Sequence, residues 1–224
     1  MSILLTIIVV LTLVELVRII SELLEWGNEL PRPDIDAILA ERYHPEECDE
    51  KMKVECQALL EDFFKEPSDL PMYLRIEHHM KGMSSEQKKV LIEQITQKTS
   101  SIMGVNIASV NFENSQSMGA YHLGKNSLMV SEAYLEFDEC NVEIIKTIFH
   151  ELKHAVQFKA ITPGGNIWGY SEETLIAWAN NFQDYINYMW DPEGYILQAI
   201  ETDSFGFECS VIPKPGFSSQ GIKE

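Results

Sequence analysis

The stretch "TIFHELKHAVQ", residues 147–157, places two histidines four positions apart with a glutamate directly after the first. Apolar residues on either side of it recur at the spacing of an α-helix. On a helix, positions i and i+4 lie one above the other, so His150 and His154 can offer two imidazole nitrogens to a single metal ion. Glu151 lies on the adjoining edge, where its carboxylate can accept a proton from water activated by the metal. Short patterns of this kind also arise by chance, and the helical context favours a zinc site.

Secondary structure can be predicted outward from this motif. A helix is expected from about residue 142 to 160, capped by Asp138 or Asn141 and ended by "TPGGN". Residues 105–112 alternate apolar and polar side chains in the manner of a strand. Residues 119–131, "GAYHLGKNSLMVS", contain two short strand-like runs joined by "LGKN", which indicates a hairpin.

Helices are predicted on both sides of these strands. An acidic helix is expected between residues 46 and 65. Another is expected to begin at Ser84, which stands in capping-box spacing with Gln87, and to end at Gly104. Two more are expected after the motif, one from near Ser171 and one from "DPEG", where proline suits the first turn.

Four regions follow from this order of elements. They are a hydrophobic N-terminal helix (residues 1–26), an acidic helical region (27–104), a domain containing the motif (105–208) and an irregular tail (209–224). A largely helical N-terminal part, then a small sheet, then further helices predict the α+β fold class.

The segment "KTIFHELKHAVQ" resembles the active-site helix of zincin metallopeptidases. The resemblance implies a zincin-like fold, in which a small, mostly antiparallel sheet packs on the active-site helix. It also implies zinc as the cofactor. Lys153 departs from the family pattern, which prefers uncharged residues between the glutamate and the second histidine, and its flexible stem would let it point outward.

A third ligand is needed to complete a catalytic zinc site of this kind. No histidine follows His154, so zincins whose third ligand is a downstream histidine are excluded. The segment "YILQAIETDSFGFE", residues 195–208, resembles the second ligand-bearing helix of small glutamate zincins. The resemblance makes Glu201 the third metal ligand and Ser204 the small residue that lets the two helices approach closely.

Other donors remain open as the third ligand. Glu172 and Glu173 lie at a distance from the motif that also suits glutamate zincins, although acidic residues at a helix start are ordinary. Cys209 is a more distant alternative.

The function that the resemblance implies is hydrolysis of peptide bonds by a metal-activated water, with Glu151 as the catalytic base. The resemblance implies that an extended peptide or protein substrate pairs with a strand of the hairpin. Tyr121 and His122 are candidates for stabilising the oxyanion, and Asp203 for orienting a ligand histidine, although each has an ordinary structural explanation. The alternatives are a non-catalytic metal-binding or interaction protein on a zincin scaffold, and an acidic membrane-anchored adaptor whose motif is coincidental.

Charge and hydropathy limit the partners. The formal net charge of -18 and the pI of about 4.7 disfavour nucleic acid, whose phosphates the protein would repel. Residues 3–24 are strongly apolar, and they are predicted either as a membrane anchor or signal-like segment, or as a buried or interface helix. The localisation is accordingly cytoplasmic or membrane-associated. The four cysteines are sparse and are expected to be free thiols.

Overall fold

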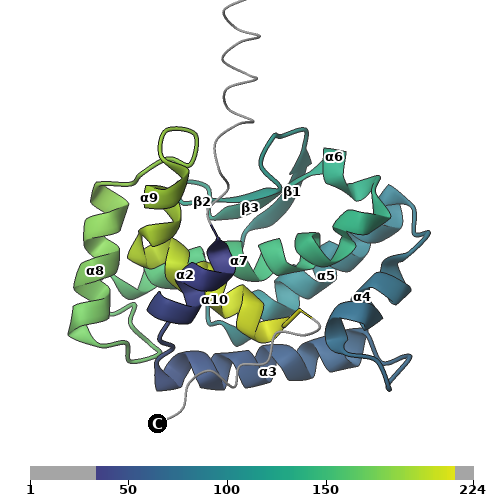
Figure 1. Ribbon diagram of the computed structural model, residues 1–224, viewed down its shortest axis with the longest axis horizontal. Coiled ribbons are helices and arrows are strands. Elements are labelled where there is room, and N and C mark those ends of the chain that lie inside the picture. Colours follow the sequence, from purple (N-terminus) through teal and green to yellow (C-terminus); the bar gives the residue numbers. More distant parts are fainter. Residues whose placement is uncertain (1–33, 215–224) are drawn as a thin grey trace, which may run out of the picture. The chain divides into compact units, whose positions relative to one another are not determined.

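Helix α7 (Asn141–Ala160) is the central element of the computed structural model, which describes residues 34–214 (Figure 1). It is the helix predicted from the motif, and both its ends lie within one residue of the expected positions. The apolar residues that recur along it at helical spacing are all buried, namely Ile144, Ile145, Ile148, Leu152, Ala155 and Val156. Neither expected cap is found, since Cys140 is at the N-cap position and Asn141 is the first residue of the helix. Asp138 belongs to a short 3-10 helix, η1 (Asp138–Cys140), and accepts hydrogen bonds from Lys88 and the Gly82 N–H.

Within the described residues, four helices precede the sheet. They are α2 (Ile35–Arg42), α3 (Glu47–Phe63), α4 (Met72–Met80) and α5 (Ser85–Ile102). Helix α5 begins with the predicted capping box, in which Ser84 Oγ accepts from the Gln87 N–H and the Gln87 side chain accepts from the Ser84 N–H. Apolar residues of α3, α4 and α5 share one hydrophobic core with α7. The acidic helical region therefore packs together with the motif helix.

A three-stranded sheet lies against α7 (Figure 1). Its strands are β1 (Ser109–Glu113), β2 (Gly119–His122) and β3 (Ser127–Ser131), in the spatial order β1-β3-β2. The predicted hairpin is confirmed, since β2 and β3 pair antiparallel across a turn at residues 123–126. The sheet is nevertheless mixed, because β3 enters between β2 and β1 and runs parallel to β1. The described part of the chain is thus α+β.

The elements after β3 bring a further helix against α7. A short helix, α6 (Glu132–Leu135), precedes η1, and the elements after α7 are α8 (Glu172–Gln183), α9 (Pro192–Leu197) and α10 (Ala199–Val211). A single helix was expected from "DPEG" onward. It is divided at Gln198, whose backbone is extended and whose side chain bonds to the backbone of Ile186 and Tyr195. Helix α10 packs directly along α7.

Two further predictions concern the apolar segment near the N-terminus and the four cysteines. Residues 3–24, the candidate anchor or interface helix, lie outside the described residues. Within residues 34–214, each helix is too short or too polar to cross a bilayer. All four cysteines are free thiols, as expected, and two of them, Cys48 and Cys56, are buried.

Candidate metal centre

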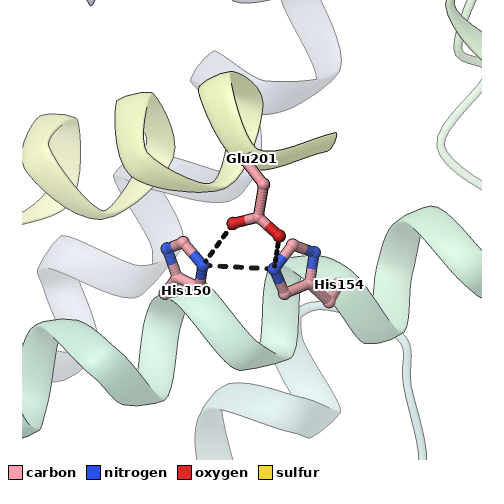
Figure 2. A group of neighbouring side chains, drawn as sticks. All are labelled: His150, His154 and Glu201. Carbon is pink, nitrogen blue, oxygen red and sulfur yellow. Dashed lines mark hydrogen bonds and ion pairs between the residues drawn. The ribbon is translucent and has the colours of Figure 1, made fainter. Parts of the chain in front are cut away.

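The side chains of His150, His154 and Glu201 converge between α7 and α10 (Figure 2). The two Nε2 atoms are 3.1 Å apart. Glu201 Oε2 lies 3.2 Å from His150 Nε2, and Glu201 Oε1 lies 3.4 Å from His154 Nε2. Two nitrogens and a carboxylate thus face one point, which is the arrangement that a divalent cation with nitrogen and oxygen ligands requires.

Helix α10 presents Glu201 to this point because its packing face is apolar or small. Ile200 and Phe207 on this helix are completely buried in the core, as is the predicted small residue Ser204. Ser204 Oγ lies 3.3 Å from His154 Nδ1, so the small side chain stands between the two helices. A larger residue there would hold α10 away from α7.

Charge is concentrated in this buried group. Burial opposes the protonated form of His150, yet the ion pairs with the nearby carboxylates of Glu201 and Glu208 outweigh burial and raise its pKa well above the ordinary value. Burial likewise opposes ionisation of Glu201, but the two histidines hold the pKa of its carboxyl well below the usual range. Glu201 is fully buried, and its Oε2 accepts no hydrogen bond from the described residues. An orphaned carboxylate oxygen beside two imidazoles fits a bound cation, whose charge would replace that of the protons.

Each of the three candidate metal ligands also contacts a second polar side chain. His154 Nδ1 lies 2.9 Å from Gln157 Oε1, and His150 Nδ1 lies 3.3 Å from Glu208 Oε2. The Tyr185 hydroxyl donates to Glu201 Oε1 at 2.8 Å. Sequence reasoning missed Gln157, Glu208 and Tyr185. Only Gln157 had a recognisable signal, since it lies three positions after His154 and therefore on the same face of the helix.

Glu151 lies beside the donor group and in contact with the edge of the sheet. Its Oε2 accepts a hydrogen bond of 2.8 Å from the Tyr121 backbone N–H of β2. Glu151, His154 and Glu201 line the same cavity of about 920 Å³, together with residues of β2 and of the loop between α8 and α9. A carboxylate that lines this cavity together with His154 and Glu201 can exchange protons with a molecule held there.

The remaining candidates lie elsewhere or have other contacts. Glu172 and Glu173 are exposed at the start of α8, and the donor group found among residues 34–214 does not include them. The Tyr121 hydroxyl donates to Asn126, and His122 is exposed at the end of β2. Asp203 accepts from Gln157, whose amide oxygen in turn contacts His154, so Asp203 is linked to a ligand histidine through Gln157.

The geometry thus defines a buried group of two histidines and a glutamate that can hold a metal ion, next to an open cavity. In comparisons with protein-family models, curated proteins and solved structures, none matches the chain.

Proposed function

We propose that the protein is a zinc-dependent metallopeptidase of the glutamate-zincin type. The observation that carries the proposal is the convergence of His150, His154 and Glu201 at one point, with Glu151 in the adjoining cavity. The motif alone does not require a carboxylate from a helix almost fifty residues later to reach both imidazoles. That convergence supports a metal site far more strongly than the spacing of the histidines does.

The ligands of the proposed zinc ion are His150 Nε2, His154 Nε2 and the Glu201 carboxylate. Two nitrogens and one oxygen are a donor set that zinc accepts, and three protein ligands are the number typical of a catalytic zinc site. When bound, zinc supplies Lewis acidity, which lowers the pKa of a water molecule and polarises a carbonyl group.

Glu151 is the proposed general base and, later in the reaction, the general acid. The hydrogen bond from the Tyr121 N–H holds one oxygen of its carboxylate at the edge of the cavity. From there the side chain accepts a proton from the attacking water and delivers it to the nitrogen of the leaving amine. Because the amide that holds Glu151 is in the backbone of β2, the position of the base depends on the packing of that strand on α7.

The proposed substrate is a peptide or protein bound in extended form. Among the described residues β2 pairs only with β3, so its other edge is free of strand pairing, apart from the contact of the Tyr121 N–H with Glu151. An extended peptide can add to such an edge through backbone hydrogen bonds. The cavity beside this edge is lined mainly by apolar and aromatic side chains, among them Leu123, Phe182 and Tyr188. Such a lining suits substrates with apolar side chains near the scissile bond.

The proposal is tested with the variant Glu151→Gln, which keeps the shape of the side chain and removes its basicity. Zinc content is measured by elemental analysis, and turnover is measured on a library of peptides. We expect stoichiometric zinc in both the unchanged protein and the Glu151→Gln variant. Only the unchanged protein should cleave peptides. The exposed Glu172→Gln variant is the control and should retain both properties.

Two results would contradict the proposal. Zinc bound by the unchanged protein without any cleavage would favour a non-catalytic metal-binding protein. Loss of zinc in Glu151→Gln would mean that Glu151 is a metal ligand and has been given the wrong role. Metal analysis of His150→Ala and Glu201→Ala, both of which should lose zinc, tests the ligands separately from the base.

A further inference from the structure

Lys153 stands inside the motif, and although its flexible stem would let it point outward, it is completely buried. Its ammonium group contacts Asp49 of α3, Asp203 of α10 and the hydroxyl of Tyr170. A buried cation held by two carboxylates is costly to desolvate, and such a cluster is weak evidence for stability. The contacts of Asp203 suggest that Lys153 has another role.

Asp203 connects the lysine to the second ligand histidine. Its Oδ2 lies 3.2 Å from Lys153 Nζ and accepts a hydrogen bond of 2.7 Å from Gln157 Nε2. The same Gln157 nitrogen donates to the Ile200 carbonyl at 2.9 Å. Two acceptors therefore fix the NH2 end of the Gln157 amide, and the Oε1 end must face the opposite way, toward His154.

The direction of these hydrogen bonds determines which nitrogen of His154 carries a hydrogen atom. Gln157 Oε1 lies 2.9 Å from His154 Nδ1 and can only accept, so Nδ1 must be the donor. In the neutral ring the lone pair is then on Nε2, the atom that faces His150 and Glu201. Ser204 also lies 3.3 Å from Nδ1, but a hydroxyl can donate or accept and does not decide the tautomer.

We propose that Lys153 is a positioning residue of the metal centre, which acts through Asp203 and Gln157 to hold His154 in the orientation and tautomer that bind metal through Nε2. An ammonium group donates only, so Asp203 must accept from it and presents an acceptor to Gln157 as well. Without the lysine, no positive charge would lie between the carboxylates of Asp49 and Asp203. Their repulsion would move Asp203 away from Gln157. The inference rests on the metal site of the proposed function and not on peptide hydrolysis.

The test compares Lys153→Met with Lys88→Met. Lys88 is also buried, with its side chain 1% exposed, and also forms an ion pair, 3.1 Å from Asp138, but it lies on α5 outside the metal centre. Both variants lose a buried cation, so both are expected to be less stable. Zinc affinity is measured by competition with a chelator, at a temperature at which circular dichroism shows both proteins folded.

We expect zinc binding to weaken by roughly 10–100-fold in Lys153→Met, the range found when a partner behind a metal ligand is lost. Lys88→Met should bind zinc as the unchanged protein does. Nitrogen-15 NMR of the zinc-loaded proteins supplies a second measurement. The Nδ1–H signal of His154 should be protected from exchange in the unchanged protein and in Lys88→Met, and lost or rapidly exchanging in Lys153→Met.

Gln157→Leu keeps the inference falsifiable if Lys153→Met does not fold, because it exchanges one uncharged side chain for another of similar size. It should show the same loss of affinity and of the Nδ1–H signal. Unchanged affinity and an unchanged signal in either variant would overturn the inference. If the unchanged protein binds no zinc at all, the metal site of the proposed function is itself contradicted, and this inference with it.

Discussion

Replacing Glu201 by glutamine tests the third ligand with little change of shape. The side chain is completely buried between α7 and α10, so the amide would occupy the same space and only the negative charge would be lost. A partner behind a metal ligand is worth about 10–100-fold in affinity, and we expect a direct anionic ligand to be worth at least the upper value. Zinc affinity should therefore fall by about 100-fold or more.

This loss can be expressed as a thermal shift. At a free zinc concentration of about 100 times the dissociation constant, binding adds about 2.7 kcal/mol to the free energy of unfolding. For a chain of roughly 150–250 residues, each kcal/mol changes the Tm by about 2–4 °C, so zinc should raise the Tm by about 5–11 °C. After a 100-fold loss of affinity, the same zinc concentration adds about 0.4 kcal/mol, or about 1–2 °C.

The assay is thermal unfolding followed by circular dichroism, with free zinc set by a metal buffer. Glu172→Gln, which changes the exposed alternative ligand on α8, should keep the full zinc-dependent shift. A full shift in Glu201→Gln would refute the assignment of the third ligand. A shift that disappears in Glu172→Gln instead would transfer that role to α8.

Three further predictions concern pH, the sheet and the core. In the metal-free protein, the raised pKa of His150 adds stability that is complete below about pH 6.5 and is lost as the pH rises through the raised pKa. The lowered pKa of Glu201 adds stability that is present above about pH 4.5 and is lost as the pH falls through the lowered pKa. Urea unfolding should therefore show the contribution of this pair at its greatest between about pH 4.5 and 6.5, and a His150→Gln variant should flatten the alkaline side of the profile. Gly119→Ala should lower both Tm and turnover, because its new methyl carbon would lie 2.4 Å from Thr147 Cγ2 and 3.2 Å from the Met129 carbonyl oxygen and would force β2 away from α7. In the matched control Gly124→Ala, the new methyl carbon meets no atom within 4 Å, so this change should be neutral. Phe149→Ala, a completely buried position on α7, should lower the free energy of unfolding by about 3–5 kcal/mol in urea titrations. Val54→Ala, at a position that is 61% exposed, should change it by less than about 0.5 kcal/mol.

Local patterns in the sequence predicted much of the secondary structure. Helix α7, the capping box of α5 and the β2–β3 hairpin all depend on residues within a few positions of each other, and each is confirmed. The division of the last helix at Gln198 was not predicted, because its cause is a set of hydrogen bonds to the loop twelve residues earlier. The parallel pairing of β1 with β3 was likewise not predicted, because the alternation of apolar and polar residues identifies a strand but not the strand it pairs with.

The candidate metal centre was predictable only where a resemblance connected distant segments. The spacing of His150 and His154 is local, but Glu201 was chosen by its resemblance to a ligand-bearing helix, and its position beside the histidines agrees with that choice. The flexible stem of Lys153 would let it point outward, but the side chain is buried. Its partner Asp49 lies 104 positions earlier in the chain, and no pattern around the motif indicates that the two residues meet.

The position of Asp49 on α3 has a consequence for any shortened form of this protein. A fragment that begins at residue 105 retains the strands, the motif and Glu201, yet it lacks one of the two carboxylates that surround Lys153. It also lacks Met52, Leu60 and Ile92, whose removal would uncover apolar faces of the remaining helices. Truncation at that boundary should yield an aggregating polypeptide, and the part that begins at residue 105 should fold only when residues 34–104 are supplied with it.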